Sequence, residues 1–306
     1  MAMPVHVIAF PGASNWPLFV GIEQGFFAAR GVDLDFSLTP NSRHMARELH
    51  AGKAQIALTA IDNIIAYVEG HGEEPLDGAA DFFAFMGVDD GLLSVMTQPE
   101  IGSLADLRGT TLAVDAMTTG FAFVLREVLH QAGLRDEEVT YASVGTGAER
   151  LAALKGGACS ATLLNAPLCL AAEAGGKRRL VRAKDVLGSY QGVVGSARRR
   201  WAQANAETLQ AFIASFRDSL AWLTDPANKD AACQLLKARM PQLSGSLGPA
   251  YDVLITDGGL IRSLEIDVAG VARVIALRHR YSAHRKKPMG APETYIDDSF
   301  RRAALD

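Results

Sequence analysis

Between residues 16 and 68 the sequence alternates between helix-like and strand-like patterns, and this alternation restricts the possible folds more than any other feature. Apolar residues recur every four positions from Leu18 to Phe26, which predicts a helix with one buried face. Gly31 can adopt the left-handed conformation that ends such a helix. Residues 32–38 then alternate between apolar and polar, as in a half-buried strand. Helices and strands in this order predict an α/β fold in which parallel strands are covered by helices.

The alternation starts again near Leu92 and changes near Tyr190. Between these two points strand-like and helix-like segments succeed each other, which favours parallel strands joined by right-handed crossovers. The strand predicted at 191–195 returns the chain to the first unit, where the amphipathic helix predicted at 206–223 packs. A chain of 306 residues is also long for a single core. We therefore expect two lobes joined by a hinge, formed by residues 1–90 with 189–306 and by residues 91–188.

Composition narrows the class of protein. Apolar residues make up 49% of the chain, which suffices for packed cores, and the net charge of −4 is ordinary. The basic runs are short and scattered, so we expect no nucleic acid partner. No segment reaches the ~18 consecutive apolar residues of a membrane span. The cysteines lie in apolar or helical surroundings, so we expect small buried side chains at Cys159, Cys169 and Cys233, and the alternative is one disulfide pair among them.

Short motifs carry a resemblance to a known family. The first helix-like segment begins with the pair 17–18, Pro-Leu, and ends in Gly-Phe-Phe at 25–27, after which Gly-Val-Asp-Leu follows at 31–34. Further on, residues 103–109 read Ser-Leu-Ala-Asp-Leu-Arg-Gly, with Thr110 where a lysine is usual. This order resembles the type 2 solute-binding proteins of ABC importers, in the branch for thiamine-pyrimidine precursors, nitrate and alkylsulfonates.

The resemblance implies the two-lobed fold of type 2 periplasmic binding proteins. Each lobe would be a mostly parallel sheet flanked by helices, with a ligand cleft between the lobes. The protein would be the substrate-binding component of an ABC-type importer, a monomer that captures a small organic molecule or oxyanion by hinge closure and presents it to a membrane permease. The resemblance implies no catalytic residue and no cofactor.

The ligand site is expected at one edge of the sheets. In open α/β sheets ligands bind beyond the carboxyl ends of the strands, where loops and helix N-termini meet. The loops that meet this condition are polar stretches flanked by apolar sequence, at 12–16, 59–63, 115–120, 165–167 and 190–191. With one arginine at the start of the second helix, the expected ligand-binding residues are Ser14, Asn15, Trp16, Arg43, Thr59, Asp62, Asn63, Thr118, Thr119, Gly120, Asn165 and Tyr190.

Several of these residues allow two interpretations. Thr118, Thr119 and Gly120 open a helix, so their amides and hydroxyls can hold an anionic or acceptor-rich ligand. One of the threonines also caps that helix. Asp62 either caps the third helix or anchors an amine or ring N–H of the ligand. Arg43 either pairs with a carboxylate or sulfonate of the ligand or lies on the surface.

The interpretation of Trp16 rests on its position after a small polar run. We expect its ring to line the cleft and to stack on a flat ligand, while Asn15 hydrogen-bonds the edge of that ligand. The alternative is a ring packed against the helix that it precedes. Asn165 and Tyr190 are included because of their positions in loops.

The signatures of common enzyme and metal sites are missing. Residues 145–150 resemble a dinucleotide-binding fingerprint, but Arg150 replaces its last glycine. His279 and His284 are not spaced to place two ligands on one helical face, so no metal is expected. The cysteine-rich motif of yeast-type pyrimidine synthases, which share the fold, is also absent. We therefore expect a protein that is not an enzyme, and the alternative is a cytosolic decarboxylase or lyase on the same scaffold.

The expected compartment depends on the N-terminal segment. Residues 1–4 lead directly into the strand predicted at 6–10, without the basic, apolar and small-residue regions of a signal peptide. We expect a periplasmic protein if a signal peptide has been removed and a cytoplasmic protein otherwise. A cytoplasmic location would favour the enzyme, and a ligand sensor without transport is a third alternative.

Overall fold

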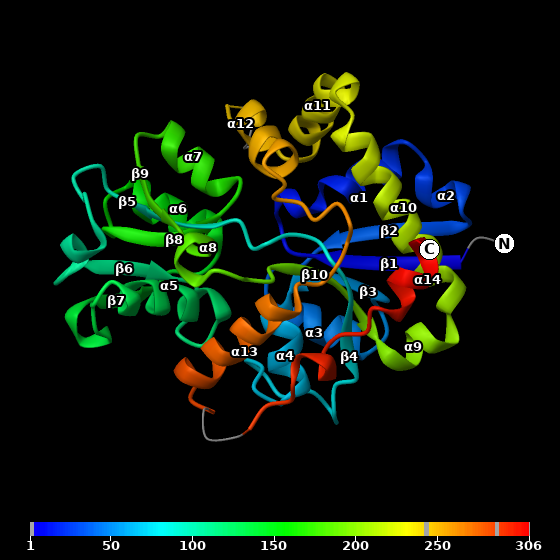
Figure 1. The fold of residues 1–306 in the computed structure, drawn as a ribbon, viewed down its shortest axis with the longest axis horizontal. Coiled ribbons are helices and arrows are strands. Elements are labelled where there is room, and N and C mark those ends of the chain that lie inside the picture. The colour runs from blue at the N-terminus through cyan, green and yellow to red at the C-terminus, as the bar shows by residue number, and fades with distance from the viewer. Residues whose placement is uncertain (1–2, 242–244, 285–287, 306) are drawn as a thin grey trace.

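The chain forms two lobes that lie side by side, each built on a five-stranded sheet (Figure 1). The computed structural model describes residues 3–241, 245–284 and 288–305. The strand order in the first lobe is β2 (Val32–Leu38), β1 (Met3–Ala9), β3 (Ile56–Ala60), β10 (Val193–Arg198) and β4 (Phe82–Gly87). The order in the second lobe is β7 (Thr140–Ser143), β6 (Thr111–Val114), β8 (Ala161–Asn165), β5 (Leu93–Thr97) and β9 (Arg178–Arg182). The expected α/β fold with two lobes is confirmed.

Each sheet is mixed, with one strand running against the other four, in agreement with the expected mostly parallel sheets. β1 pairs in parallel with β2 and β3, and β6 pairs in parallel with β7 and β8. β10 and β5 run antiparallel to both of their neighbours. The chain enters these two strands from the other lobe, so they run away from the boundary between the lobes. The carboxyl ends of β1, β3, β6 and β8 therefore face that boundary.

Helices cover both faces of the first sheet (Figure 1). One face carries α1 (Trp16–Glu23), α2 (Phe26–Ala29), α10 (Ala206–Thr224) and α14 (Ser299–Leu305). The other face carries α3 (Ser42–His50), α4 (Ile61–Val68) and α13 (Val268–Tyr281). The long helix predicted at 206–223 forms as α10. Leu209, Phe212 and Phe216, whose spacing predicted this helix, are completely buried on one face of it.

The second sheet is covered in the same way. One face carries α6 (Gly147–Lys155) and α7 (Leu168–Ala174), and the other carries α5 (Gly120–Gln131) and α8 (Ala183–Leu187). Side chains cap several helices, as in α6, where Thr146 and Glu149 form a reciprocal capping box. The remaining α-helices belong to the first lobe and are α9 (Arg199–Ala204), α11 (Lys229–Arg239) and α12 (Leu247–Tyr251). Among the described helices, none is both long and apolar enough to cross a membrane.

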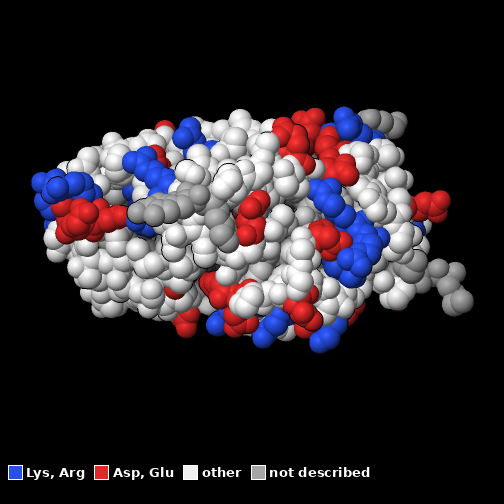
Figure 2. All heavy atoms as spheres, turned by 90° about the horizontal axis from the view of Figure 1, so that it is seen from below, with Lys and Arg blue, Asp and Glu red and all other residues white. Residues whose placement is uncertain are grey.

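Charged side chains of both signs are mixed on the face seen from below in Figure 2. The first lobe has one cluster of opposite charges at the exposed start of α3, where Arg43 lies 3.7 Å from Glu73 and 3.4 Å from Glu74. Another is at the start of α9, where Arg200 lies 3.8 Å from Asp81. Figure 2 shows basic and acidic atoms interspersed on this face rather than one broad basic surface.

Candidate functional site at the boundary between the lobes

The chain crosses between the lobes twice, and Asp89 holds the two crossings together. One crossing is 88–92 and the other is 188–192. The Oδ1 atom of Asp89 accepts hydrogen bonds from the amides of Gly91 and Val193, both at 2.8 Å. Its Oδ2 atom accepts a hydrogen bond from the hydroxyl of Ser14. A single buried carboxylate thus joins both crossings to the loop that follows β1.

The crossings pack so closely that one position needs glycine. A Cβ atom added at Gly192 would lie 2.1 Å from the backbone nitrogen of Gly91 and 2.2 Å from Oδ1 of Asp89. Any side chain there would force the two crossings apart. Burial raises the pKa of the Asp89 carboxyl, although the three hydrogen bonds that it accepts act in the opposite direction.

On one side of the crossings, helix α13 of the first lobe packs on helix α5 of the second, and we call this the closed side. Arg278 of α13 donates two hydrogen bonds to Asp62 of α4, at 2.8 and 2.6 Å, and both side chains are buried. The guanidinium of Arg278 lies 5.3 Å from the ring centre of Phe123 in α5. Gly120 lies against Asp62, because a Cβ atom added there would be 2.6 Å from its carboxyl carbon.

A second group of contacts on the closed side involves the end of α13. The hydroxyl of Tyr281 donates a hydrogen bond of 2.7 Å to Glu127 of α5. Arg126 donates to the backbone carbonyl of Tyr281 at 3.3 Å and lies over its ring at 4.5 Å. Arg280 pairs with Glu127 at 3.1 Å. These contacts join the two lobes through side chains far apart in the sequence.

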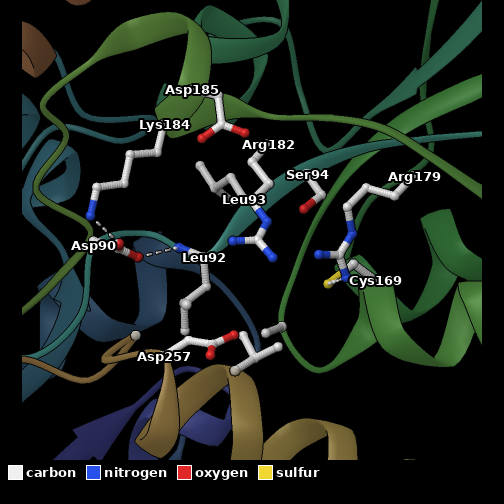
Figure 3. A pocket seen from close by; sticks show the side chains of 13 residues that line it. Asp90, Leu92, Leu93, Ser94, Cys169, Arg179, Arg182, Lys184, Asp185 and Asp257 are labelled. Atoms are coloured by element: carbon white, nitrogen blue, oxygen red, sulfur yellow. Dashed lines mark hydrogen bonds and ion pairs between the residues drawn. The ribbon is translucent and has the colours of Figure 1, made fainter.

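The other side of the crossings lies toward α7 and α12 (Figure 1), and we call it the open side. It contains a cavity of about 280 Å³ between the lobes, and Figure 3 shows the side chains that line this cavity. Basic and acidic side chains both line it. Lys184 pairs with Asp90 at 2.7 Å, and Arg179, which lines the same cavity, pairs with Glu173 outside it at 2.8 Å. The cavity is lined by Asp90, Leu92, Leu93, Ser94, Ala166, Cys169, Arg179, Arg182, Lys184, Asp185, Val253, Asp257 and Gly259.

The structure corrects the interpretation of Trp16. Its ring is completely buried, its Nε1 donates to the backbone carbonyl of Ala232 at 3.2 Å, and it lies edge-on to Tyr251 at 5.9 Å. The prediction that this ring lines the cleft is therefore wrong, because α11 and α12 already cover it. The alternative of a packed ring was nearer, but its partners Ala232 and Tyr251 belong to α11 and α12 rather than to the helix that begins at Trp16.

Two further assignments change. Asp62 does not cap α4, since Ala60 is the N-cap residue and Asp62 lies in the first turn, where it pairs with Arg278. This carboxylate is therefore already neutralised by an internal partner. Arg43 lies at the exposed start of α3 and pairs with Glu73 and Glu74, so it points to surface acids rather than to the boundary.

The other residues of the first lobe lie beside the crossings and contact one another. Asn15 is buried, and its side-chain amide donates a hydrogen bond of 2.8 Å to the carbonyl of Phe10. This amide therefore stabilises its own loop. Asn63 donates to the hydroxyl of Thr59 at 2.9 Å. The ring of Tyr190 is buried against Gly91, and burial and the nearby Asp62 carboxylate raise the pKa of its hydroxyl.

In the loop 115–120 of the second lobe, the two neighbouring threonines have different roles. Thr119 is the N-cap residue of α5, accepting from the amide of Ala122 at 3.2 Å and donating to Asp115 at 2.6 Å. Thr118 is exposed beside it. Burial raises the pKa of the Asp115 carboxyl, with Arg150 acting against this shift. Asn165, at the end of β8, pairs with Leu93 across the sheet and is only partly buried.

Sequence reasoning missed the residues that organise this boundary, namely Asp89, Arg278, Arg182 and Asp257. The run Gly-Val-Asp-Asp-Gly at 87–91, a polar turn between two apolar strands, was a usable signal for Asp89. Arg278 lies 216 residues from Asp62, and no local pattern marks the pair. No group of three or more His, Cys, Asp or Glu side chains in the described ranges is arranged to hold a metal ion.

The sequence profile of the NMT1/THI5-like family matches residues 13–229. No curated protein is similar enough in sequence to be matched. Many solved structures share the fold at low identity, among them two binding proteins and an enzyme.

The periplasmic nitrate-binding protein NrtA from Synechocystis PCC 6803 is 12% identical, with a TM-score of 0.79, and the match covers 98% of this chain and 88% of that one. The periplasmic aliphatic sulphonate binding protein SsuA from Escherichia coli is 18% identical, with a TM-score of 0.74 and coverage of 96% and 92%. The desulfurization enzyme DSZB is 14% identical, with a TM-score of 0.68 and coverage of 98% and 99%. The fold is thus common to binding proteins and to at least one enzyme.

Proposed function

The chain belongs to the NMT1/THI5-like family, and from this premise we propose that it is the solute-binding component of an ABC-type importer. It captures a small organic molecule or oxyanion between its two lobes. The observation that carries the proposal is the cavity between the lobes beside two chain crossings, since lobes joined in this way can close on a ligand by a hinge motion. Binding proteins among the structural neighbours support it.

The two moving bodies follow from the crossings. We assign residues 1–90 with 189–306 to one lobe and residues 91–188 to the other, because the chain changes sheets within these limits. The closed side, with its buried ion pair, serves as the pivot. The open side narrows when the ligand binds, and the ligand shifts the population toward the closed form by the difference between its affinities for the two forms.

The proposed partners follow from this role. The closed form of a monomer is presented to a membrane permease, and the protein acts on the outer face of that membrane. We propose no catalytic residue. Ser14, Thr59, Asn63, Thr118, Asn165 and Tyr190 remain candidates for ligand contact beside the crossings, although none of them lines the cavity. The carboxylates that do line it are those of Asp90, Asp185 and Asp257, and we assign them to binding rather than to proton transfer. The neighbouring desulfurization enzyme makes turnover the outcome that the test has to exclude.

Native mass spectrometry of the protein purified from its own source without added ligand tests the proposal. We expect one small molecule bound to each chain, lost after partial unfolding and dialysis, and regained when the released fraction is returned. The molecule should have the same mass after prolonged incubation with the protein. A changed mass would favour an enzyme, and a chain that retains no small molecule from any extract would contradict the proposal.

A further inference from the structure

Only some of the charged side chains that line the cavity on the open side have an ion-pair partner. Lys184 and Arg179 each have a carboxylate partner. Arg182 has no ion pair within 4.0 Å among the described residues, and the same holds for Asp185 of the second lobe and for Asp257 of the first. The cavity therefore contains an arginine and an aspartate that face a shared space without neutralising each other.

These two side chains come from opposite lobes. Arg182 is the last residue of β9 in the second lobe, and Figure 3 shows its guanidinium pointing into the middle of the cavity. Asp257 follows the π-helical turn 252–256 of the first lobe, and its carboxylate lies below Arg182 in the same view. The amide of Asp257 bonds to the carbonyl of Asp252 at 2.7 Å, which holds this turn in shape.

We propose that this cavity binds a small molecule that carries both an acid group and a cationic group. Arg182 receives the acid group, since its planar guanidinium can donate two parallel hydrogen bonds to a carboxylate or a similar group. Asp257 receives the cationic group. The inference rests on the proposed function. To that function it adds the chemical class of the ligand and the residues that bind its two charged groups.

Charge complementarity favours such a ligand over one with a single charge. A simple anion bound at Arg182 would also face the carboxylates of Asp185 and Asp257, which line the same cavity. A simple cation bound at Asp257 would face Arg182. A molecule with both charges meets opposite charge at each end, and an interface gains its specificity from this kind of match.

The size and the apolar part of the cavity set limits on the rest of the ligand. The volume of about 280 Å³ is close to the lower end of the range for small-molecule sites, roughly 300–1,000 Å³. Leu92, Leu93 and Val253 provide apolar wall between the charged ends. The ligand is therefore short, with a hydrocarbon segment between its charges, and it contacts both lobes when bound.

Calorimetric titration with a series of linear ω-amino acids tests the inference. The probes are β-alanine, 4-aminobutanoate and 6-aminohexanoate, which differ in the distance between their charges. Butanoate and butylamine are the matched compounds with one charge each. We expect the best ω-amino acid to bind roughly tenfold or more tightly than either single-charge compound. Equal binding of butanoate or butylamine would overturn the inference.

Two variants locate the binding. Arg182→Gln and Asp257→Asn should each weaken binding of the best ω-amino acid by roughly tenfold or more, because each removes one charge-assisted contact. The controls are Arg200→Gln, an arginine 88% exposed and outside the cavity, and Asp77→Asn, an exposed aspartate in a loop. Both controls should bind like the parent. Loss of binding in the controls, or none in the cavity variants, would contradict the assignment.

The outcome can be separated from that of the importer proposal. The molecule found by native mass spectrometry is titrated against the parent, Arg182→Gln and Asp257→Asn. If it binds all three equally, the importer proposal stands and this inference fails. If the parent retains no molecule at all, the importer proposal fails, and the titration with ω-amino acids still decides whether the cavity binds molecules of both charges.

Discussion

The two sides of the boundary between the lobes use the same kinds of charged residue in opposite ways. On the closed side Arg278 and Asp62 are buried and paired at 2.6 Å. On the open side Arg182 and Asp257 face the same cavity and are exposed to solvent. A buried charge without its partner is strongly unfavourable, whereas a solvated charge costs little until it is used. The contrast separates charges that hold the molecule together from charges available for a ligand.

Removing the arginine on each side and comparing the losses of stability is the strongest test of this contrast. Arg278→Ala leaves the Asp62 carboxylate buried without a partner, and we expect the free energy of unfolding to fall by about 3–5 kcal/mol. Arg182→Ala removes a solvated side chain and should change it by less than ~0.5 kcal/mol. Urea denaturation followed by circular dichroism measures both. Equal losses in the two variants would show that the sides do not differ as described.

The next largest effect on the free energy of unfolding is expected at Asp89, whose carboxylate lies at the crossings between the two sides. Asp89→Ala leaves the amides of Gly91 and Val193 buried without their acceptor, and a loss of about 2–4 kcal/mol in the free energy of unfolding is expected. Asp89→Asn keeps one acceptor oxygen and should lose clearly less. The same denaturation experiment compares the two variants, and an alanine variant as stable as the parent would remove Asp89 from its role at the crossings.

The charge of Asp89 also predicts a dependence on pH. Burial raises its pKa in the folded state, so the folded state binds this proton more tightly than the unfolded state. The contribution of Asp89 to stability is therefore complete below the pKa of the unfolded state, ~3.9, and is lost as the pH rises through the higher folded-state value. Relative to Asp89→Asn, the parent should gain stability as the pH is lowered. A difference between them that stays constant with pH would contradict the shift.

A smaller effect is expected at Trp16, which lies away from both sides. Trp16→Phe removes the hydrogen bond to Ala232 and part of the buried ring, so the free energy of unfolding should fall by about 1–2 kcal/mol. Ligand affinity should be unchanged, because the ring has no surface at the boundary. Calorimetry on the variant decides this point. A marked loss of affinity with intact stability would restore Trp16 as a ligand residue.

The smallest effect is expected from the pair of threonines at the start of α5. Thr119→Val removes the helix cap and should lower the free energy of unfolding by about 1 kcal/mol. Thr118→Val, at the exposed neighbour, should leave stability unchanged, and it should also leave ligand affinity unchanged, because Thr118 does not line the cavity on the open side. Denaturation and calorimetry on both variants check these expectations, and a Thr118 variant that binds the ligand more weakly than the parent would contradict them.

The fold could be predicted because its signals are local. The spacing that marked the long C-terminal helix reflects one buried face, as Phe212 and Phe216 show. The motifs shared with the solute-binding family lie in single segments, such as Pro17 at the second position of α1. The direction of the one reversed strand in each sheet, β10 and β5, was not specified by the sequence, because it depends on where the chain enters each lobe, and no local pattern records that.

The site was less accessible to sequence reasoning because its contacts join distant segments. Asp62 was expected to face a ligand or to cap a helix, but its partner lies 216 residues further on. Trp16 was expected at the cleft, but helices formed much later in the chain cover it. Polarity and loop position predict that a residue lies near the boundary. They do not predict whether the protein itself supplies its partner.

Hydrogen exchange followed by mass spectrometry tests most directly the claim that the ligand binds on the open side. The protein is compared with and without a saturating concentration of the tightest-binding ω-amino acid. We expect slower exchange of the backbone amides in 88–93, 182–192 and 253–260, which surround the cavity, and little change in 120–131 and 274–281 on the closed side. Slowing confined to the closed side, or no slowing at the cavity, would contradict the account.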